Sequence, residues 1–286
     1  KKSYFEIVYA TIIKINDKVV KQNDLAKIFR VVWLLPSMDR LWLEGADGRR
    51  KFLDRLTLSF FPKHADYVLN YEKAMRERNR LLKEKMTDDV WYKALERQMA
   101  QNGLLIQSNR IAALKKISSA QENSTTTFPI AELSLSKTNG DLTTDEDEYV
   151  KALSENRQLD IMAGRTLIGP HRSDMEANYK EKGISAKDSS TGEQKAMLIS
   201  IVLANARALK LELGYPPVIL LDEISAHLDI DRRGALYEEI NALGAQAWMT
   251  GTDKNLFSEF GCKAKYFHVI ESSGISDIKE VDFSVD

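Results

Sequence analysis

Apolar residues follow two different periods along the chain and divide it into three stretches. Residues 4–15 and 29–35 are rich in β-branched and aromatic side chains, which predicts strands. From residue 48 to residue 117, apolar positions recur every three or four residues and Gly and Pro are scarce, which predicts long helices. We expect these helices over 49–60, 65–85 and 90–117. After Asp160 short apolar runs alternate with a helical stripe, as in a mixed α/β fold.

Turn-forming and charged residues mark where these elements end. Asn16 and Asp17 predict the turn of a β-hairpin, and Pro36 ends the strand over 29–35. The acidic run over 141–148 predicts an exposed loop. In the last third of the chain we expect strands over 166–168, 218–221 and 247–249, and a helix over 196–213 that ends at Gly214.

The order of these elements places a block of helices between two α/β segments. We therefore expect residues 1–44 to form the first, β-rich part of a sheet-based head. Residues 45–155 are expected to form a helical arm, and residues 156–286 the second half of the head.

Charge and cysteine content exclude several classes of protein. The chain has 41 Lys and Arg against 42 Asp and Glu, a formal charge of −1, so it is not a uniform polycation that coats nucleic acid. Its one cysteine, Cys262, excludes a disulfide framework and a cysteine-built zinc site, and suits a reducing cytoplasm, where we expect the protein. No apolar run approaches the length of a membrane span, about 18 residues.

Positive charge is concentrated in the helical stretch. Within residues 70–116 the chain has 11 Lys and Arg and 6 Asp and Glu, a local excess of +5. One interpretation is a solvated helix face with ion pairs between residues four apart. The other is a surface that follows the phosphates of nucleic acid.

A buried strand followed by two carboxylates is the strongest chemical signal. Residues 218–221 are all apolar, and Asp222 and Glu223 follow at the carboxyl end of the strand, where open α/β sheets bind ligands. Adjacent acids repel one another unless a cation or a proton separates their roles. The usual division assigns Asp222 to a hydrated Mg²⁺ and Glu223 to the water that attacks a phosphate. The alternative is a polar turn, or an acid that caps the next helix.

A second motif lies just before the predicted helix over 196–213. Ser190 and Glu193 have the spacing of a capping box, which is the purely structural interpretation. A hydroxyl and Gly192 at a helix N-terminus also allow a terminal phosphate to approach the exposed N–H groups. Gly192 precedes Asp222 by 30 residues, which is the length of one helix and a turn.

Two weaker motifs follow. Asp229, seven residues after Asp222, could reach across a subunit boundary and help arrange the attacking water. Thr252 follows the strand over 247–249, where a side chain could sense the terminal phosphate. Each of these two is more simply a strand-to-helix turn, but the four motifs together match the signature, Walker B, D-loop and switch of an ATP-binding-cassette (ABC) protein. The expected fold class is therefore α/β, an ABC-type ATPase head with an inserted helical arm.

The stretch 164–169 satisfies the pattern G-x-x-x-x-G but is not expected to bind phosphate. Pro170 and His171 stand where a phosphate-binding loop needs Lys and then Ser or Thr. No other stretch qualifies, so we expect the Walker A half of the site in a segment before Lys1.

Three stretches, residues 164–174, 189–209 and 218–229, together resemble the RecF family of bacterial recombination and repair proteins. The resemblance extends to residues 31–55 and 71–82, and so covers essentially the whole chain. It implies a protein that dimerises on ATP, binds double-stranded, single-stranded and gapped DNA, and works with RecR and RecO to load the RecA recombinase. It also implies a weak, DNA-stimulated ATPase activity of the full-length protein and a nucleoid-associated location in the cytoplasm.

The resemblance also implies a role for each motif residue. Asp222 would coordinate Mg²⁺, and Glu223 would be the catalytic base. Ser190 and Gly192 would contact the γ-phosphate held by the opposite subunit, and Asp229 would act across the interface. The full set of ATP-contacting residues would be Ser190, Thr191, Gly192, Glu193, Asp229 and Thr252.

Some residues depart from the ABC pattern or have no assigned role. Glu193 stands where many cassette proteins have glutamine, which places an acid near phosphates, and Thr252 where many have histidine. His171 and Arg172 lie in a stretch shared with the family without a role that follows from it. Arg172 is as well explained by a contact between loop and sheet.

Two other function classes stay open. A chain that naturally begins at Lys1 would lack the phosphate-binding lysine, and would be a nucleotide-independent DNA-binding or docking scaffold. The paired acids Asp222 and Glu223 argue against this interpretation. The nucleotide-binding subunit of an ABC transporter would share the head motifs but not the helical block.

Overall fold

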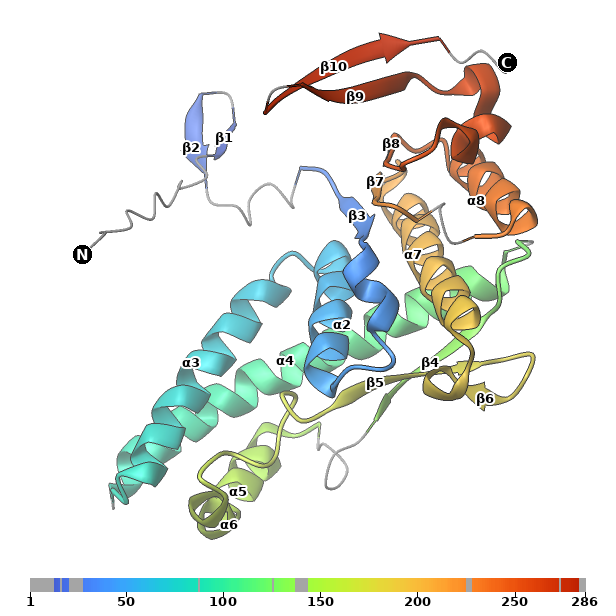
Figure 1. Cartoon of the computed structure of the whole chain (residues 1–286). Coiled ribbons are helices and arrows are strands. Elements are labelled where there is room, and N and C mark those ends of the chain that lie inside the picture. The colour runs from blue at the N-terminus through green and yellow to red at the C-terminus, as the bar shows by residue number, and fades with distance from the viewer. Residues whose placement is uncertain are drawn as a thin grey trace.

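The fold consists of two packed regions that share one long helix, α4, as Figure 1 shows. The computed structural model describes residues 13–15, 17–20, 28–86, 88–124, 126–136, 144–224, 228–272 and 274–282. The α-helices are α2 (Ala46–Phe60), α3 (His64–Lys83), α4 (Asp89–Glu122), α5 (Glu146–Glu155), α6 (Arg157–Ala163), α7 (Thr191–Leu213) and α8 (Ile230–Leu243). Short 3₁₀ helices are η1 (Pro36–Arg40), η2 (Ala186–Asp188) and η4 (Lys254–Lys263). The strands are β1 (Ile13–Ile15), β2 (Lys18–Val20), β3 (Val31–Leu34), β4 (Ala131–Ser136), β5 (Asp174–Tyr179), β6 (Ile184–Ser185), β7 (Val218–Leu221), β8 (Ala247–Met249), β9 (Tyr266–Ser272) and β10 (Ile275–Val281).

A parallel sheet with the order β3-β7-β8 forms the centre of the head. Val31 pairs with Val218 and Leu34 with Leu221, while Leu221 also pairs with Met249 on the other side. The strands predicted over 29–35, 218–221 and 247–249 are confirmed. Because all three described strands are parallel, their carboxyl ends lie at the same edge of the sheet.

A second, antiparallel sheet with the order β4-β5-β6 was not predicted. Met175 and Ala177 of β5 are buried, and they alternate with the exposed Glu176. The predicted strand over 166–168 is wrong. Thr166 instead gives its backbone N–H to the side chain of Asn79, at 2.8 Å, so this donor is engaged outside any sheet.

The predicted helices are present, and most are longer than expected. α7 spans Thr191–Leu213 and is capped by Gly214, whose φ of +78° is the left-handed conformation typical of the residue after a helix. The predicted loop over 141–148 is wrong for its last residues, because Glu146, Asp147 and Glu148 form the first turn of α5. Three acids there interact favourably with the positive helix N-terminus. The earlier residues 141–143 lie outside the described part of the chain.

Two clusters of buried apolar side chains hold these elements together. The main core packs α7 against the parallel sheet, α2, α8 and the C-terminal half of α4. The arm core packs α3 and α5 against the N-terminal half of α4. Met99 and Ile106 lie in the arm core and Ala113 and Ile117 in the main core, so α4 belongs to both. The domain limits after residues 44 and 155 stay a prediction.

Two hairpins complete the described structure. β1 and β2 pair antiparallel, and Asp17 takes a φ of +63° in the turn between them, as the predicted hairpin requires. Residues 4–12 of the predicted first strand lie outside the described part of the chain. β9 and β10 form the second hairpin, which Figure 1 shows beyond β8. Within the described residues, no helix combines the length and the apolar character that crossing a membrane requires.

Candidate functional site

Polar residues follow the parallel strands at the carboxyl edge of the sheet. Asp222 and Glu223 follow β7, and Thr250 follows β8. The Thr250 hydroxyl donates a hydrogen bond to Asp222 Oδ1, at 2.6 Å, and accepts one from the Glu223 N–H, at 3.0 Å. The Asp222 N–H donates to the carbonyl of Leu34 in β3, at 3.0 Å. Hydrogen bonds from the two neighbouring strands therefore fix both acids of the predicted Walker B motif at the carboxyl edge of the sheet.

The backbone of Glu223 has a conformation that is rare for a residue with a side chain. Its φ of +53° lies in the left-handed region, which costs on the order of 1 kcal/mol outside glycine. The hydrogen bond from its N–H to Thr250 is one interaction that holds this conformation. Thr250 belongs to the same stretch as the predicted switch residue Thr252, and was assigned no role of its own from the sequence. The roles of Asp222, Glu223 and Thr252 remain predictions.

The predicted signature lies at the exposed N-terminus of α7. Ser190 is the N-cap, and the capping box with Glu193 is confirmed. Glu193 Oε2 accepts hydrogen bonds from the Ser190 N–H and hydroxyl, both at 2.8 Å, while Glu193 Oε1 pairs with Lys182. The ion pair with Lys182, with help from Ser190, lowers the pKa of Glu193 to about 2. Thr191 and Gly192 are exposed beside Ser190.

The predicted D-loop residue lies next to the signature. Asp229 is the N-cap of α8, and its side chain accepts a hydrogen bond from the Arg232 N–H at 2.8 Å. Arg232 Nη1 in turn donates to the carbonyl of Gly192 at 3.4 Å. The structure thus brings Asp229 and Gly192 together through one arginine. Residues 225–227 lie outside the described part of the chain.

The Walker B and signature residues form two separate groups on this chain. α7 has 23 residues and extends about 34 Å, and after a short turn the four residues of β7 run back toward the N-terminus of α7 over about 13 Å. Asp222 and Glu223 contact the sheet edge, whereas Ser190 and Glu193 contact Lys182 in the β5–β6 turn. The two groups share no side chain among their described contacts.

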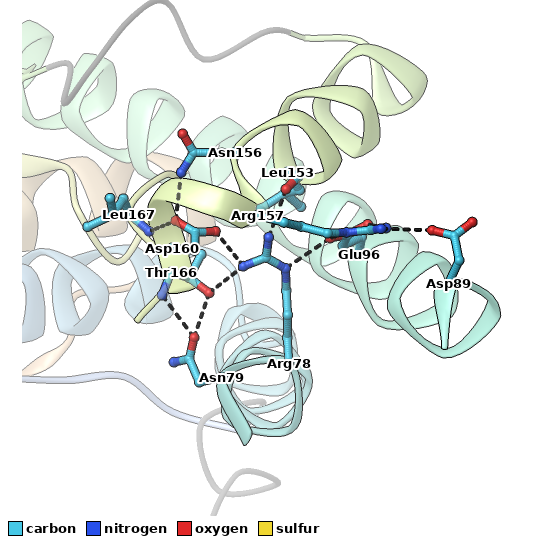
Figure 2. Close-up of polar contacts among 10 residues, drawn as sticks. All are labelled: Arg78, Asn79, Asp89, Glu96, Leu153, Asn156, Arg157, Asp160, Thr166 and Leu167. Atoms are coloured by element: carbon cyan, nitrogen blue, oxygen red, sulfur yellow. Dashed lines mark hydrogen bonds and ion pairs between the residues drawn. The ribbon is translucent and has the colours of Figure 1, made fainter. Parts of the chain in front are cut away.

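A buried ionic network, shown in Figure 2, was not predicted from the sequence. Arg78 of α3 is fully buried and donates to Glu96 of α4 at 3.1 Å and to Asp160 of α6 at 2.6 Å. It also donates to the hydroxyl of Thr166, at 2.9 Å, and to the carbonyl of Leu153, at 2.7 Å. This arginine of α3 therefore joins α4, α5 and α6 to the segment 164–174, which we name the strap.

A second arginine extends this network toward the solvent. Arg157 donates to both carboxylate oxygens of Glu96, at 2.8 and 2.6 Å, and to Asp89 at 2.7 Å. Its guanidinium carbon lies 4.7 Å from the ring centroid of Tyr92. Figure 2 shows Arg157 beside Arg78, with Glu96 bound by both. The fully buried carboxylate of Glu96 is thus compensated by two cations.

The rest of the strap binds further side chains of the helical stretch. Arg110 donates to the Pro170 carbonyl at 2.7 Å and to the Ser173 hydroxyl at 3.0 Å, and holds both oxygens of Asp54. Burial acts to raise the pKa of Asp54, but hydrogen bonds from His64 and Arg110 bring it below its ordinary value.

His171 has a structural place within the strap. Its Nδ1 lies 2.8 Å from the Tyr71 hydroxyl, and its Nε2 lies 3.0 Å from the carbonyl of Thr166. Burial lowers the pKa of His171 to about 4, so the ring is neutral at pH 7. Gly169, with a φ of +130°, allows this close packing, because a Cβ atom there would meet the Tyr71 hydroxyl at 2.2 Å. The strap therefore joins helices through its backbone and side chains, and its lack of a phosphate-binding role stays a prediction.

The buried arginines change the interpretation of the basic stretch. Arg78 and Arg110 belong to the 11 cations of residues 70–116, but both are buried and paired. An exposed basic stripe remains on one face of α3, formed by Lys73, Arg76, Arg80 and Lys83. Arg76 and Arg80 make ion pairs with glutamates four and three residues away, as a solvated helix face would.

A parallel sheet that ends in two carboxylates, with a capped motif helix and inserted helices, defines an α/β ATPase head of the ABC type. The chain is 44% identical over 265 residues to the DNA replication and repair protein RecF of Agrobacterium fabrum, and covers 70% of that relative. It is 43% identical over 270 residues to RecF of Rhizobium johnstonii, and covers 71% of it. These alignments include 90% and 91% of this chain. The chain belongs to the RecF family of DNA replication and repair proteins.

Solved structures agree with the fold. The chain is similar to the recombination mediator protein RecF solved with ATPrS, with a TM-score of 0.75 and 22% identity over 96% of this chain and 74% of that one. The same mediator solved with ATP gives a TM-score of 0.73 at 22% identity. The expected fold class is confirmed. No protein-family model matches the chain.

Proposed function

We propose that this chain belongs to an ATP-gated, DNA-binding recombination mediator of the RecF type, and that it carries the signature and Walker B residues of the ATPase site. Two copies would close around shared triphosphates, each held by the Walker motifs of one copy and the Ser190–Gly192 tip of the other. The observation that supports this most is the separation of the two groups. Ser190 lies exposed at the far end of α7, whereas Asp222 and Glu223 lie at the sheet edge. No described contact joins the two groups within one chain, which favours a nucleotide shared between two copies.

Asp222 and Glu223 would have different roles at the sheet edge, metal binding and proton acceptance. Asp222 and Thr250 offer the hard oxygen donors that Mg²⁺ takes together with substrate phosphates and water. Such a site needs no cage of three acidic or histidine side chains, and the described residues contain none. Bound Mg²⁺ would neutralise charge on the phosphates. Glu223 would accept the proton of the attacking water, and Thr250 would hold its backbone in place.

The residues of the signature would act across the interface. Ser190, Thr191 and Gly192 would offer a hydroxyl and exposed N–H groups to the γ-phosphate. Asp229 would reach the same interface, since Arg232 holds it beside Gly192. Thr252, exposed after β8, would act as the switch residue. ATP binding would favour the closed dimer, and hydrolysis would release it.

The remaining parts of the proposal come from the family. We assign the full-length protein a weak, DNA-stimulated ATPase activity and a nucleoid-associated place in the cytoplasm. Its partners would be double-stranded, single-stranded and gapped DNA, RecR directly, and RecO and RecA indirectly. The solved relatives are described as recombination mediators of the RecFOR pathway, which supports this set of partners. A nucleotide-independent scaffold remains the competing function.

Replacing Ser190 with arginine tests the shared-site proposal. In the full-length protein, Ser190→Arg should abolish ATP-dependent dimerisation, because a long cation would occupy the tip that meets the other subunit's nucleotide. ATP binding by the monomer should persist. Light scattering with and without ATP measures dimerisation, and titration with a fluorescent nucleotide measures ATP binding. Ser276→Arg, the same change on the exposed strand β10, is the control and should dimerise normally. A scaffold would show no ATP-dependent dimer in any variant.

Reversing two charges of the exposed α3 stripe tests whether DNA binds to this surface of the helical arm. Lys73→Glu with Lys83→Glu removes two cations of the exposed α3 stripe and should weaken DNA binding at all sequences. The slope of log K against log salt should fall by about 2, roughly one per phosphate contact. Lys265→Glu with Lys279→Glu, near β9 and β10, is the matched control. Unchanged affinity at low salt would place the DNA on another surface.

A further inference from the structure

Glu193 presents an electrostatic problem for the proposed function. It lies three residues after Ser190 in the exposed first turn of α7, where the γ-phosphate of the opposing subunit would bind. A carboxylate beside a triphosphate repels it, and the repulsion grows as water leaves the closing interface. The structure contains a feature that offsets this charge.

Lys182, in the turn between β5 and β6, forms an ion pair with Glu193 Oε1. The other oxygen, Oε2, binds the N–H and the hydroxyl of Ser190, each at 2.8 Å. Each oxygen of Glu193 therefore has a distinct task. One is neutralised by a cation, and the other fixes the N-cap residue of the signature helix.

The sheet fixes the position of Lys182. The N–H groups of Lys182 and Gly183 both donate to the carbonyl of Tyr179, at 3.2 and 2.8 Å. Gly183 has a φ of +65°, the left-handed conformation that closes this turn. Lys182 Nζ also lies 5.3 Å from the ring centroid of Tyr179. The ammonium group is thus directed to the signature by a turn outside α7.

Ser190 has a single hydroxyl proton, which it now donates to Glu193 Oε2. If this hydroxyl turns to a phosphate oxygen, Glu193 loses one donor but keeps the Ser190 N–H and Lys182. We propose that Lys182 is a positioning residue of the signature that acts through Glu193. It cancels the charge of Glu193 toward the phosphate and keeps the N-cap in place when the Ser190 hydroxyl leaves. This inference rests on the proposed function.

The test measures ATP-dependent dimerisation of the full-length protein by analytical ultracentrifugation. Lys182→Ala should weaken each signature contact roughly two- to fivefold, the range for exposed charge pairs. A symmetric dimer has two such sites, so the dimer dissociation constant should rise about four- to 25-fold. Lys180→Ala removes the same charge from the same turn, but its partner is Glu122. That control should leave the dissociation constant unchanged, and ATP binding by both monomers should match the wild type.

A rescue variant separates electrostatics from folding of the turn. Glu193→Gln in the Lys182→Ala background should restore dimerisation, because glutamine keeps the capping box without a charge to cancel. If Lys182 only stabilised its turn, Glu193→Gln would not rescue, and that result would overturn the inference. Wild-type dimerisation by Lys182→Ala would overturn it as well. Absence of an ATP-dependent dimer in the wild type would instead overturn the proposed function, and the inference with it.

Discussion

Replacing Glu223 with glutamine in the full-length protein is expected to lower ATP turnover by about 10²- to 10⁴-fold, the usual contribution of a general base. ATP binding should persist, and the ATP-bound dimer should live longer. Glutamine has nearly the shape of glutamate and keeps the N–H that binds the Thr250 hydroxyl. The change therefore removes the proton acceptor and leaves the neighbouring Asp222 in its hydrogen bond with Thr250.

Single-turnover hydrolysis and dimer lifetime together measure this effect. Glu223→Gly is an informative companion, because glycine adopts a φ near +53° without strain. Glu223→Gly should be at least as stable toward denaturant as the wild type, and should hydrolyse ATP as slowly as Glu223→Gln. Loss of turnover in both variants would separate the chemistry of Glu223 from its effect on folding. Turnover within twofold of the wild type by Glu223→Gln would refute its assignment as the base.

The parallel sheet and the cap of α7 could be predicted because their causes are local. The apolar run 218–221 forms the central strand, with Ile219 and Leu221 buried and Leu220 exposed, and the acids after it lie at the sheet edge. Ser190 and Glu193 form their capping box within one helical turn. Buried and less buried side chains also alternate along parts of β4 and β5. The sequence does not show this alternation as a hydrophobic pattern, because small and polar residues such as Ala177 and Asn178 occupy these strands.

The strap could not be predicted because its partners are distant in sequence. Thr166 has the β-branched character of a strand residue, but its N–H and hydroxyl bind Asn79, 87 residues earlier. Arginine is a residue type usually found at exposed helix positions, but Arg78 is buried and its partner Asp160 lies 82 residues away. Its helical spacing from Ala74 and Leu81 places it on the apolar face of α3, unlike the exposed Arg80, but no local pattern identifies its distant partners. Charge counts over residues 70–116 therefore overstate the cations that face solvent.

The same network leads to the second large expected effect. Arg78→Ala should lower the free energy of unfolding by about 3–5 kcal/mol, the cost of removing one member of a buried ionic network. Both Arg78 and Asp160 are fully buried, so the carboxylate would lose its cation without gaining water. Urea unfolding of the full-length protein, followed by circular dichroism, measures the change. Arg80→Ala, on the same helix with an exposed partner, should change stability by less than about 1 kcal/mol.

Arg78→Met distinguishes lost charge from lost volume. Methionine fills much of the space of the arginine stem, so a loss close to that of Arg78→Ala would assign the effect to the unpaired Asp160 and to the hydrogen bonds with Thr166 and Leu153. Hydrogen exchange should then accelerate first in α3, α5 and the N-terminal half of α4, which form the arm core around this network. β7 should stay protected, because it packs in the main core. Equal stability of Arg78→Ala and Arg80→Ala would show that the arm is held to the strap by apolar packing alone.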